Sequence, residues 1–328
     1  MRPTGVILLI FLCFLQVFAS EIENKELSRI DSAVDMMYNE KFEDALSVFI
    51  SINETYPDHP AGPFFMGYYY NFLASFYETD KFDSKIVLHY NNAEKKADFH
   101  LGFDKNDPWM NFYKGASLIN RGYLLSRDGR NFSALSKTLD GISFIKEALR
   151  QGEEIGDAKL LYGTYLFYRS EMISWIWDKR PEAVKIVSES IESSNFSRYL
   201  AVSTLGWMYI DYEKFGKAEE MADLALEKYP ESHLFLFLKA RSLFEQKKFD
   251  DAEQLYLKLL LKIENMEARL SNIDLFNSYY FLSRIYYEMS DHEKSRNFRK
   301  KALGLNLSIK EKDILEKRIE YLNGLKFR

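Results

Sequence analysis

A spaced pattern of small and aromatic residues recurs along this chain and restricts its fold more than any other feature. The clearest copy contains Leu205, Gly206, Tyr209, Phe215, Ala218, Ala225 and Pro230. Small residues such as Gly206 and Ala218 let two antiparallel helices approach closely. The aromatic residue between them seals the turn, and the proline stops the second helix before the next unit. The segment therefore predicts one pair of helices.

The same frame recurs on both sides of Gly206. One small residue marks each of seven predicted pairs: Ala33, Gly67, Gly115, Gly163, Gly206, Ala240 and Ser283. The first step, from Ala33 to Gly67, has the same length as the step from Gly206 to Ala240. The first, fifth, sixth and seventh copies stay near the full pattern, whereas the second to fourth are degenerate and elongated. Because one such pair cannot bury its apolar face alone, neighbouring pairs are expected to stack.

These residues and their offsets resemble the tetratricopeptide repeat (TPR) family. The resemblance implies an all-α fold, a right-handed α-α superhelix (TPR solenoid) of about seven helix pairs. In residues 308–325, Leu315, Ile319 and Leu322 fall at i, i+4 and i+7 with charged residues between them. That spacing is typical of a C-terminal capping helix. Since no Gly/Ser/Pro-rich linker interrupts the chain, we expect residues 20–328 to form a single TPR-type α-solenoid domain.

The middle of the chain resembles a narrower group. The segments that carry the resemblance are His59-Pro60-Ala61-Gly62-Pro63, Asp107-Pro108-Trp109 with Tyr113 and Gly115, and Asp157-Ala158 with Gly163, Tyr165, Tyr168 and Ser170. They look like the pattern of uncharacterised exported bacterial TPR proteins. The resemblance implies a cell-envelope setting and adds no catalytic residue.

The N-terminus predicts export. Arg2 precedes an apolar run from Val6 to Ala19, which is shorter than the roughly 20 residues that a membrane-spanning helix needs. We expect a signal peptide, residues 1–19, cleaved after Ala19, and a periplasmic or cell-envelope location. An uncleaved membrane anchor is the alternative. The single cysteine, Cys13, lies inside this run, so the mature chain would have no thiol for a disulfide, a metal site or a nucleophile.

The sequence shows little sign of catalytic chemistry. The formal net charge is −5 and no basic face is evident, which argues against a nucleic-acid partner. The five histidines have no metal-binding spacing, and neither a phosphate-binding loop nor a Gly-x-Ser-x-Gly elbow occurs. We expect surface or loop roles for the histidines, no metal, no cofactor and no enzyme activity. The enzymatic alternative is Glu171, an acid among aromatic residues, acting as in a glycosidase.

The TPR resemblance also implies a binding surface, because the first helix of each pair lines a concave groove in TPR solenoids. Polar positions of this frame include Asp157 and Asn277. Aromatic residues and arginine are enriched at binding hot spots. We define the predicted groove set as Phe64, Tyr68, Trp109, Phe112, Phe167, Trp207, Phe237, Arg241, Tyr280, Arg284 and Tyr287.

This set predicts a non-catalytic cell-envelope adaptor that holds a protein or peptide partner. An acidic group of the partner would bind Arg241 and Arg284, since arginine pairs with a carboxylate through two parallel hydrogen bonds. The second hypothesis is a soluble carrier of a small hydrophobic or lipid-like ligand for a transport system. The structural alternative is that the aromatic rings fill the groove by packing on one another.

Overall fold

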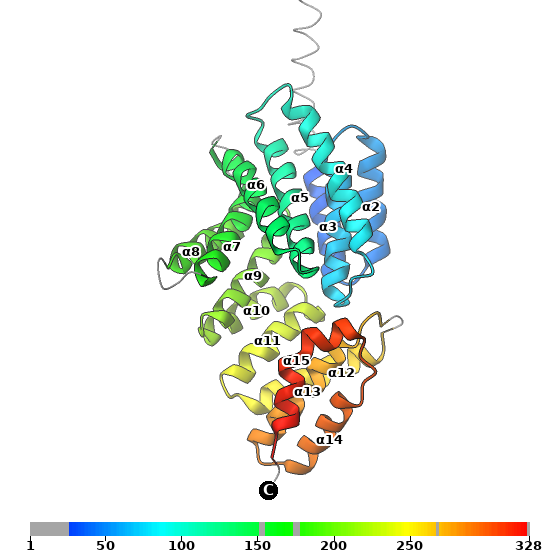
Figure 1. The fold of residues 1–328 in the computed structure, drawn as a ribbon, viewed down its shortest axis with the longest axis vertical. Coiled ribbons are helices and arrows are strands. Elements are labelled where there is room, and N and C mark those ends of the chain that lie inside the picture. Colours follow the sequence, from blue (N-terminus) through cyan, green and yellow to red (C-terminus); the bar gives the residue numbers. More distant parts are fainter. Residues whose placement is uncertain (1–25, 151–154, 173–177, 267–268, 327–328) are drawn as a thin grey trace, which may run out of the picture. The chain divides into compact units, whose positions relative to one another are not determined.

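The computed structural model describes residues 26–150, 155–172, 178–266 and 269–326, without the side chains of residues 171 and 172. The predicted signal peptide lies outside these ranges. Every regular element in the described part is a helix, as the repeat predicts (Figure 1). No described helix is both long enough and apolar enough to cross a membrane.

The described helices follow one another as seven pairs and a final single helix. Residues 26–38 form the first helix. The others are α2 (Phe42–Thr55), α3 (Ala61–Phe76), α4 (Asp83–Leu101), α5 (Pro108–Arg127), α6 (Asn131–Arg150), α7 (Gly156–Met172), α8 (Arg180–Ser193), α9 (Arg198–Asp211), α10 (Phe215–Lys228), α11 (His233–Glu245), α12 (Phe249–Glu264), α13 (Ile273–Glu288), α14 (His292–Leu303) and α15 (Ile309–Gly324). The predicted number of pairs is confirmed.

The chain divides into two compact units. Unit 1 contains the described residues of Met1–Tyr69 and Ser84–Arg198, and unit 2 contains those of Tyr70–Asp83 and Tyr199–Arg328. Unit 2 therefore combines a short early segment with the last repeats. Within unit 2, that early segment is tied to the last helix by an ion pair between Asp80 and Lys310 at 2.8 Å. A single domain over residues 20–328 stays a prediction.

The small residues that mark the repeats lie where two helices come close together. Ala33 and Ala240 are fully buried. A Cβ atom added to Gly115 on α5 would lie 2.8 Å from the carbonyl oxygen of Gly141 on α6. One added to Gly206 would lie 2.5 Å from a methyl group of Leu238. Both distances are shorter than a carbon contact allows. At Gly115 the neighbour is backbone, so the helix spacing requires glycine there, whereas at Gly206 it is a side-chain end that can move.

In every pair except the fourth, whose turn is only partly described, the turn contains a residue with positive φ. In the four pairs nearest the repeat pattern it follows the small residue at one constant offset, at Glu40, Glu213, Lys247 and Ser290. In the second and third pairs the offset is greater, and the residue is Glu78 or Gly129. The additional length is about one helical turn in the second pair and about two in the third. Lengthening by whole turns keeps the inter-helix turn on the same face, which explains how these elongated repeats are accommodated.

The last helix has the features of a cap. Ser308 accepts a hydrogen bond from the backbone N–H of Glu311 at 3.2 Å, and the Glu311 carboxylate accepts one from the N–H of Ser308 at 2.7 Å. This reciprocal capping box fixes the start of α15. Leu315 and Leu322 are fully buried on its inner face. α15 therefore begins and ends within the predicted segment 308–325.

Candidate functional site

Four members of the predicted groove set lie close together in unit 1. The ring centroids of Phe64 and Phe112 are 5.5 Å apart, and Trp109 lies 5.7 Å from Phe112. Phe196 joins them, at 6.4 Å from both Phe64 and Tyr68 and 5.9 Å from Phe112. Phe64 and Phe112 are almost fully buried, at 3% and 2% exposure. These two rings therefore serve the interior of unit 1, which is what the self-packing alternative describes.

Phe196 was not predicted from the sequence, and its position depends on Asp157. The loop between α8 and α9 passes over the buried Asp157 side chain, whose carboxylate accepts hydrogen bonds from the backbone N–H groups of Asn195 at 3.0 Å and Ser197 at 2.9 Å. The Ser197 hydroxyl donates a third at 2.5 Å. Burial raises the pKa of Asp157, and these hydrogen bonds oppose the rise. The predicted groove position of Asp157 is thus wrong, because its side chain is used to hold this loop.

Three further members lie on other helices. Phe167 on α7 is buried, at 1% exposure, with its ring 5.3 Å from Tyr168. Trp207 on α9 is partly exposed. Tyr287 at the end of α13 is also partly exposed, and its hydroxyl donates to the carbonyl oxygen of Lys326 at 3.3 Å.

The remaining members converge in unit 2. Phe237 and Arg241 lie on α11, and Tyr280 and Arg284 lie on α13. The Arg241 guanidinium lies 4.9 Å from the centre of the Phe281 ring and pairs with Glu245 on its own helix at 2.6 Å. Arg241 is therefore already paired with a carboxylate of its own helix, where the sequence analysis expects an acidic group of the partner.

Arg284 is held by aromatic groups instead of a carboxylate. Its guanidinium lies 4.6 Å from the ring centre of Phe244, 4.8 Å from that of Tyr321 and 5.4 Å from that of Tyr280. It donates one hydrogen bond, from Nη1 to the Tyr280 hydroxyl, at 3.1 Å. Such contacts between a guanidinium and ring faces hold the charge without cancelling it.

A third arginine, Arg318 on α15, completes the cluster and was missed by the sequence prediction. Its guanidinium lies 5.8 Å from the Tyr280 ring centre and 5.9 Å from that of Phe281, and it donates to the side-chain oxygen of Asn277. We call Arg241, Arg284 and Arg318 the arginine cluster. The heptad-like spacing of Leu315 and Leu322 predicts the inner face of α15 but does not say against which helix that face packs.

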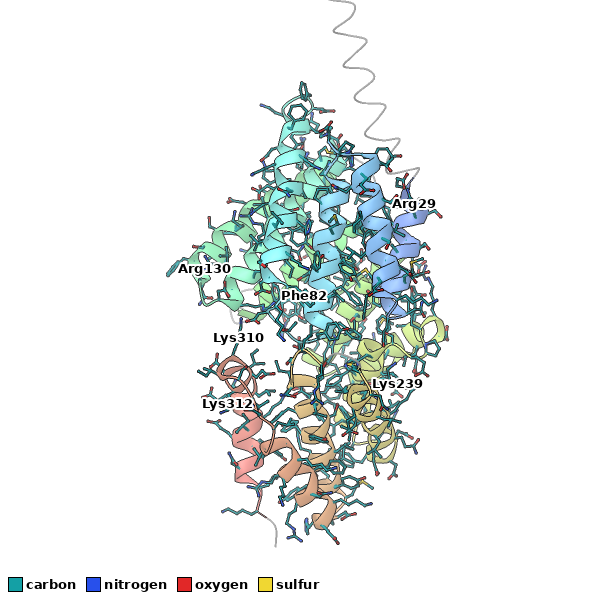
Figure 2. The ribbon with its side chains drawn as sticks, turned by 90° about the vertical axis from the view of Figure 1, so that its right-hand side faces the viewer. Arg29, Phe82, Arg130, Lys239, Lys310 and Lys312 are labelled. Carbon is teal, nitrogen blue, oxygen red and sulfur yellow. The ribbon has the colours of Figure 1, made fainter. Side chains whose placement is uncertain are left out.

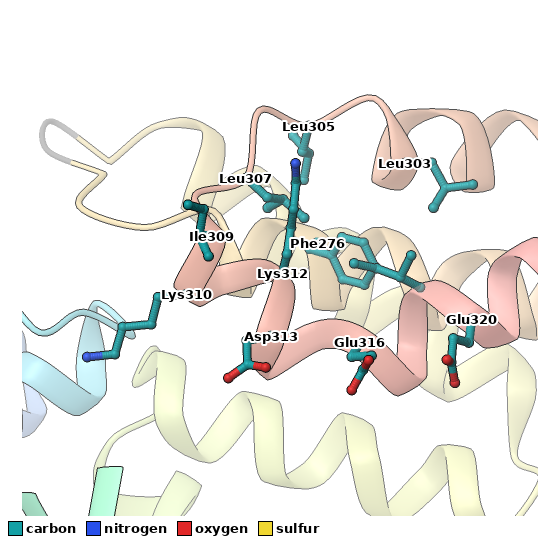
Figure 3. A pocket seen from close by; sticks show the side chains of 11 residues that line it. Phe276, Leu303, Leu305, Leu307, Ile309, Lys310, Lys312, Asp313, Glu316 and Glu320 are labelled. Carbon is teal, nitrogen blue, oxygen red and sulfur yellow. The ribbon is translucent and has the colours of Figure 1, made fainter. Parts of the chain in front are cut away.

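The structure also contains an open pocket in unit 2, of about 700 Å³. Figure 3 shows the ring of Phe276 beside the leucines that end α14 and follow it, with Asp313, Glu316 and Glu320 extending from α15. Lys310 and Lys312 project from the start of the same helix (Figure 2). The lining includes no member of the predicted groove set: it consists of Phe276, Leu303, Leu305, Leu307, Ile309, Lys310, Lys312, Asp313, Glu316, Ile319 and Glu320.

One of the five histidines is both helical and buried. His233, expected at the surface or in a loop, is buried at the start of α11, with Nε2 3.4 Å from a carboxylate oxygen of Asp274. The start of α11 places the His233 ring inside unit 2, so the expectation of a surface or loop position is wrong for His233.

The predicted catalytic alternative, Glu171, has its side chain outside the described part of the chain. Within the described part, no group of three or more histidine, cysteine or acidic residues is placed to hold a metal ion.

Comparison with known proteins gives likeness in structure only. No protein-family model matches the chain, and no curated protein sequence matches it. Solved structures similar to it include PilW, a type IV pilus biogenesis factor. The two sequences are 15% identical, the alignment covers 70% of this chain and 91% of PilW, and the TM-score is 0.48. A second is the C-terminal part of a TPR repeat-containing protein from Cytophaga hutchinsonii, with 19% identity, 91% and 100% covered, and a TM-score of 0.45. A third is a TPR protein from Parabacteroides merdae, with 14% identity, 92% and 100% covered, and a TM-score of 0.41. The fold assignment rests on the chain's own repeat: the helices of the described part form seven consecutive pairs, each marked by a small residue, and this makes the chain a TPR-like α-solenoid.

Proposed function

We propose that this chain is a non-catalytic adaptor that binds a protein or peptide partner through the partly exposed members of the predicted groove set. The observation that supports the proposal most directly is the arginine cluster, where guanidinium groups lie on aromatic rings at a partly exposed surface. Arginine and aromatic side chains are the residue types that dominate binding energy at protein interfaces. The adaptor would act in the cell envelope after removal of residues 1–19.

Site-specific photo-cross-linking tests this function. A photoreactive phenylalanine analogue would replace Trp109, Trp207, Phe237 or Tyr287, one at a time, in the native cell. Leu257 on α12, which is 39% exposed and outside the predicted groove set, supplies the matched control position. The proposal expects one partner protein to be captured from two or more groove positions and not from Leu257, and to bind the purified chain afterwards.

Two measurements separate the proposal from its alternatives. Mass spectrometry of an organic extract of the purified protein is expected to show no stoichiometric small molecule, whereas a bound lipid would replace the adaptor with a carrier. Turnover of a polysaccharide substrate that disappears in Glu171→Gln would replace it with a hydrolase.

The envelope location has its own test. N-terminal sequencing of the protein from fractionated cells is expected to begin at Ser20, in the periplasmic or envelope fraction. Recovery of the intact N-terminus in the membrane fraction would instead indicate an uncleaved anchor.

A further inference from the structure

The arginine cluster brings three positive side chains from three different helices of unit 2 to the same aromatic surface. Arg241 and Arg318 both lie within 6 Å of the Phe281 ring centre, at 4.9 and 5.9 Å. Arg318 and Arg284 lie 5.8 and 5.4 Å from the Tyr280 ring centre. All three arginines are partly exposed. A soluble group could therefore reach the cluster.

Most of the hydrogen-bonding capacity of these guanidinium groups is unused. Each has five N–H donors. Arg284 uses one on the Tyr280 hydroxyl, and Arg318 uses one on Asn277. The Nε atoms of Arg241 and Arg284 are buried and have no hydrogen-bond partner within the described residues. Buried donors without acceptors are costly, which makes this cluster receptive to an additional acceptor.

The charges at the cluster do not balance. Glu245 pairs with Arg241, and in the described part of the chain neither Arg284 nor Arg318 has a carboxylate within 4.0 Å. Three guanidinium groups and the one carboxylate paired with them leave two positive charges without a contacting carboxylate, and Glu78 attracts Arg318 only weakly. Burial lowers the pKa of Arg318, and repulsion from Arg241 lowers it further, against weaker attractions from Tyr280, Tyr256 and Glu78. The guanidinium groups therefore repel one another through a partly desolvated space.

A second unsatisfied group lies in the same electrostatic environment. Tyr256 on α12 is fully buried, and its hydroxyl has no hydrogen-bond partner among the described residues. Its ring stacks on Phe281, with centroids 4.9 Å apart. Burial raises the pKa of this hydroxyl most. The three arginines of the cluster lower it, and Glu245 raises it. The cluster thus combines excess positive charge with polar atoms that have no protein partner.

We propose that the arginine cluster is a binding site for a phosphate dianion, carried as a phosphomonoester on an apolar or aromatic group. Two negative charges match the two guanidinium groups, of Arg284 and Arg318, that have no contacting carboxylate in the described part of the chain, and the guanidinium fork fits phosphate oxygens in a bidentate manner. Arg284 and Arg318 bind the phosphate directly, while Arg241 stays paired with Glu245. The exposed side of Tyr321, 37% accessible, contacts the apolar group. This proposal goes beyond the protein-binding role proposed above, which draws on the same cluster. The two can fail separately, because partner capture is tested by cross-linking from Trp109, Trp207, Phe237 and Tyr287, and phosphate binding by small probes on the purified chain.

Binding of small probes to the purified chain tests the site. Phenyl phosphate, inorganic phosphate and phenylacetate would be titrated by calorimetry and followed by the arginine Nε–H signals in ¹⁵N NMR spectra. We expect phenyl phosphate to bind most tightly, inorganic phosphate more weakly and phenylacetate weakest. Arg284→Gln with Arg318→Gln is expected to weaken phenyl phosphate binding by at least about tenfold, the loss of roughly one charge-assisted hydrogen bond.

Matched variants keep the result interpretable. Lys317→Gln removes one charge from an exposed position next to Arg318 on α15 and is expected to leave binding within about twofold. Arg284→Lys with Arg318→Lys keeps the charge but loses the fork, so an intermediate affinity is expected even if the glutamine variant unfolds. The unfolding midpoint of each variant reports on folding.

A further experiment distinguishes a lipid headgroup from a soluble phosphate compound as the ligand. Sedimentation with phosphatidylcholine vesicles, with and without phosphatidic acid, asks whether a lipid headgroup is bound, whereas binding of phenyl phosphate without vesicle binding indicates a soluble ligand. Equal affinity for phenylacetate and phenyl phosphate, or no binding of any probe and no vesicle binding, would overturn the proposal.

Discussion

The carboxylate of Asp157 and the residue Ser197, 40 positions apart, are joined by two hydrogen bonds, one from the Ser197 backbone N–H at 2.9 Å and one from its hydroxyl at 2.5 Å. Asp157 lies at the start of α7 and Ser197 directly before α9. This link fixes the loop that carries Phe196 into the aromatic cluster of unit 1. A single buried acid thus positions a ring that the repeat pattern does not include.

Replacing Asp157 tests that relationship. Asp157→Ala removes the acceptor of the backbone N–H groups of Asn195, Phe196 and Ser197 and of the Ser197 hydroxyl, and we expect it to lower the free energy of unfolding by about 2–4 kcal/mol. Asp157→Asn keeps one acceptor oxygen and is expected to cost less. Urea denaturation measures the change, and near-ultraviolet circular dichroism follows the aromatic cluster. Asp140→Asn, at an exposed position on α6, is the control, and an equal effect of both asparagine variants would contradict this role.

The close approach of α5 and α6 at Gly115 gives a second prediction. Gly115→Ala places a methyl group 2.8 Å from a backbone oxygen, so the two helices must separate, and we expect a loss of about 1–3 kcal/mol in the free energy of unfolding. Gly216→Ala is the matched control, because its added Cβ meets nothing within 4 Å. In that helix alanine is expected to raise stability by up to about 1 kcal/mol. Thermal unfolding that shows a lower stability for Gly115→Ala and a higher one for Gly216→Ala would support the close approach of α5 and α6. A stabilised Gly115→Ala protein would refute it.

The positive φ in the turns predicts stabilisation by glycine. Glu213 has a φ of 55°, in the left-handed region where a side chain is unfavourable. Glu213→Gly is expected to raise the free energy of unfolding by about 0.5–1 kcal/mol after allowing for the greater freedom of glycine in the unfolded chain. Glu220→Gly, also exposed but inside α10, is expected to lower it by about 1 kcal/mol. Chemical denaturation of both variants checks the pair, and a destabilised Glu213→Gly protein is the contrary result.

Glu311 gives a prediction for pH. Burial acts to raise the pKa of Glu311, but hydrogen bonds from the N–H groups of Asn272 and Ser308 outweigh it, so the pKa lies below its ordinary value of 4.5. A depressed pKa in the folded state means that ionised Glu311 stabilises the fold above pH 4.5 and that this contribution is lost as the pH falls further.

Glu311→Gln is therefore expected to be less stable than the parent protein by about 1–2 kcal/mol at pH 7. The difference should shrink as the pH is lowered from 4.5 towards 3, measured by urea denaturation at each pH. Glu316→Gln, exposed on the same helix, serves as the control. A difference between Glu311→Gln and the parent that stays constant over this pH range would show that the carboxylate charge is not the cause.

The sequence by itself determined the helix pairs. Small residues such as Gly115 and Gly206 lie where neighbouring helices come close together, and helix–turn–helix geometry is set within a single repeat. The pattern therefore predicts seven pairs, their turns and the cap α15 without any knowledge of distant contacts. It also placed Arg241 and Arg284 correctly on the first helices of adjacent repeats.

Only the tertiary structure decided which side chains share a site. Arg318 joins Arg284 because α15 packs on α13, whereas the pairing of Arg241 with Glu245 is a local contact one turn apart on α11. Asp157 does not serve the groove because its donors come from the loop that follows α8, in the next part of the chain. Local periodicity specifies which face of a helix is apolar, but the partner of that face depends on packing between elements far apart in the chain. Such packing of α15 on α13 adds the charge of Arg318 to the arginine cluster.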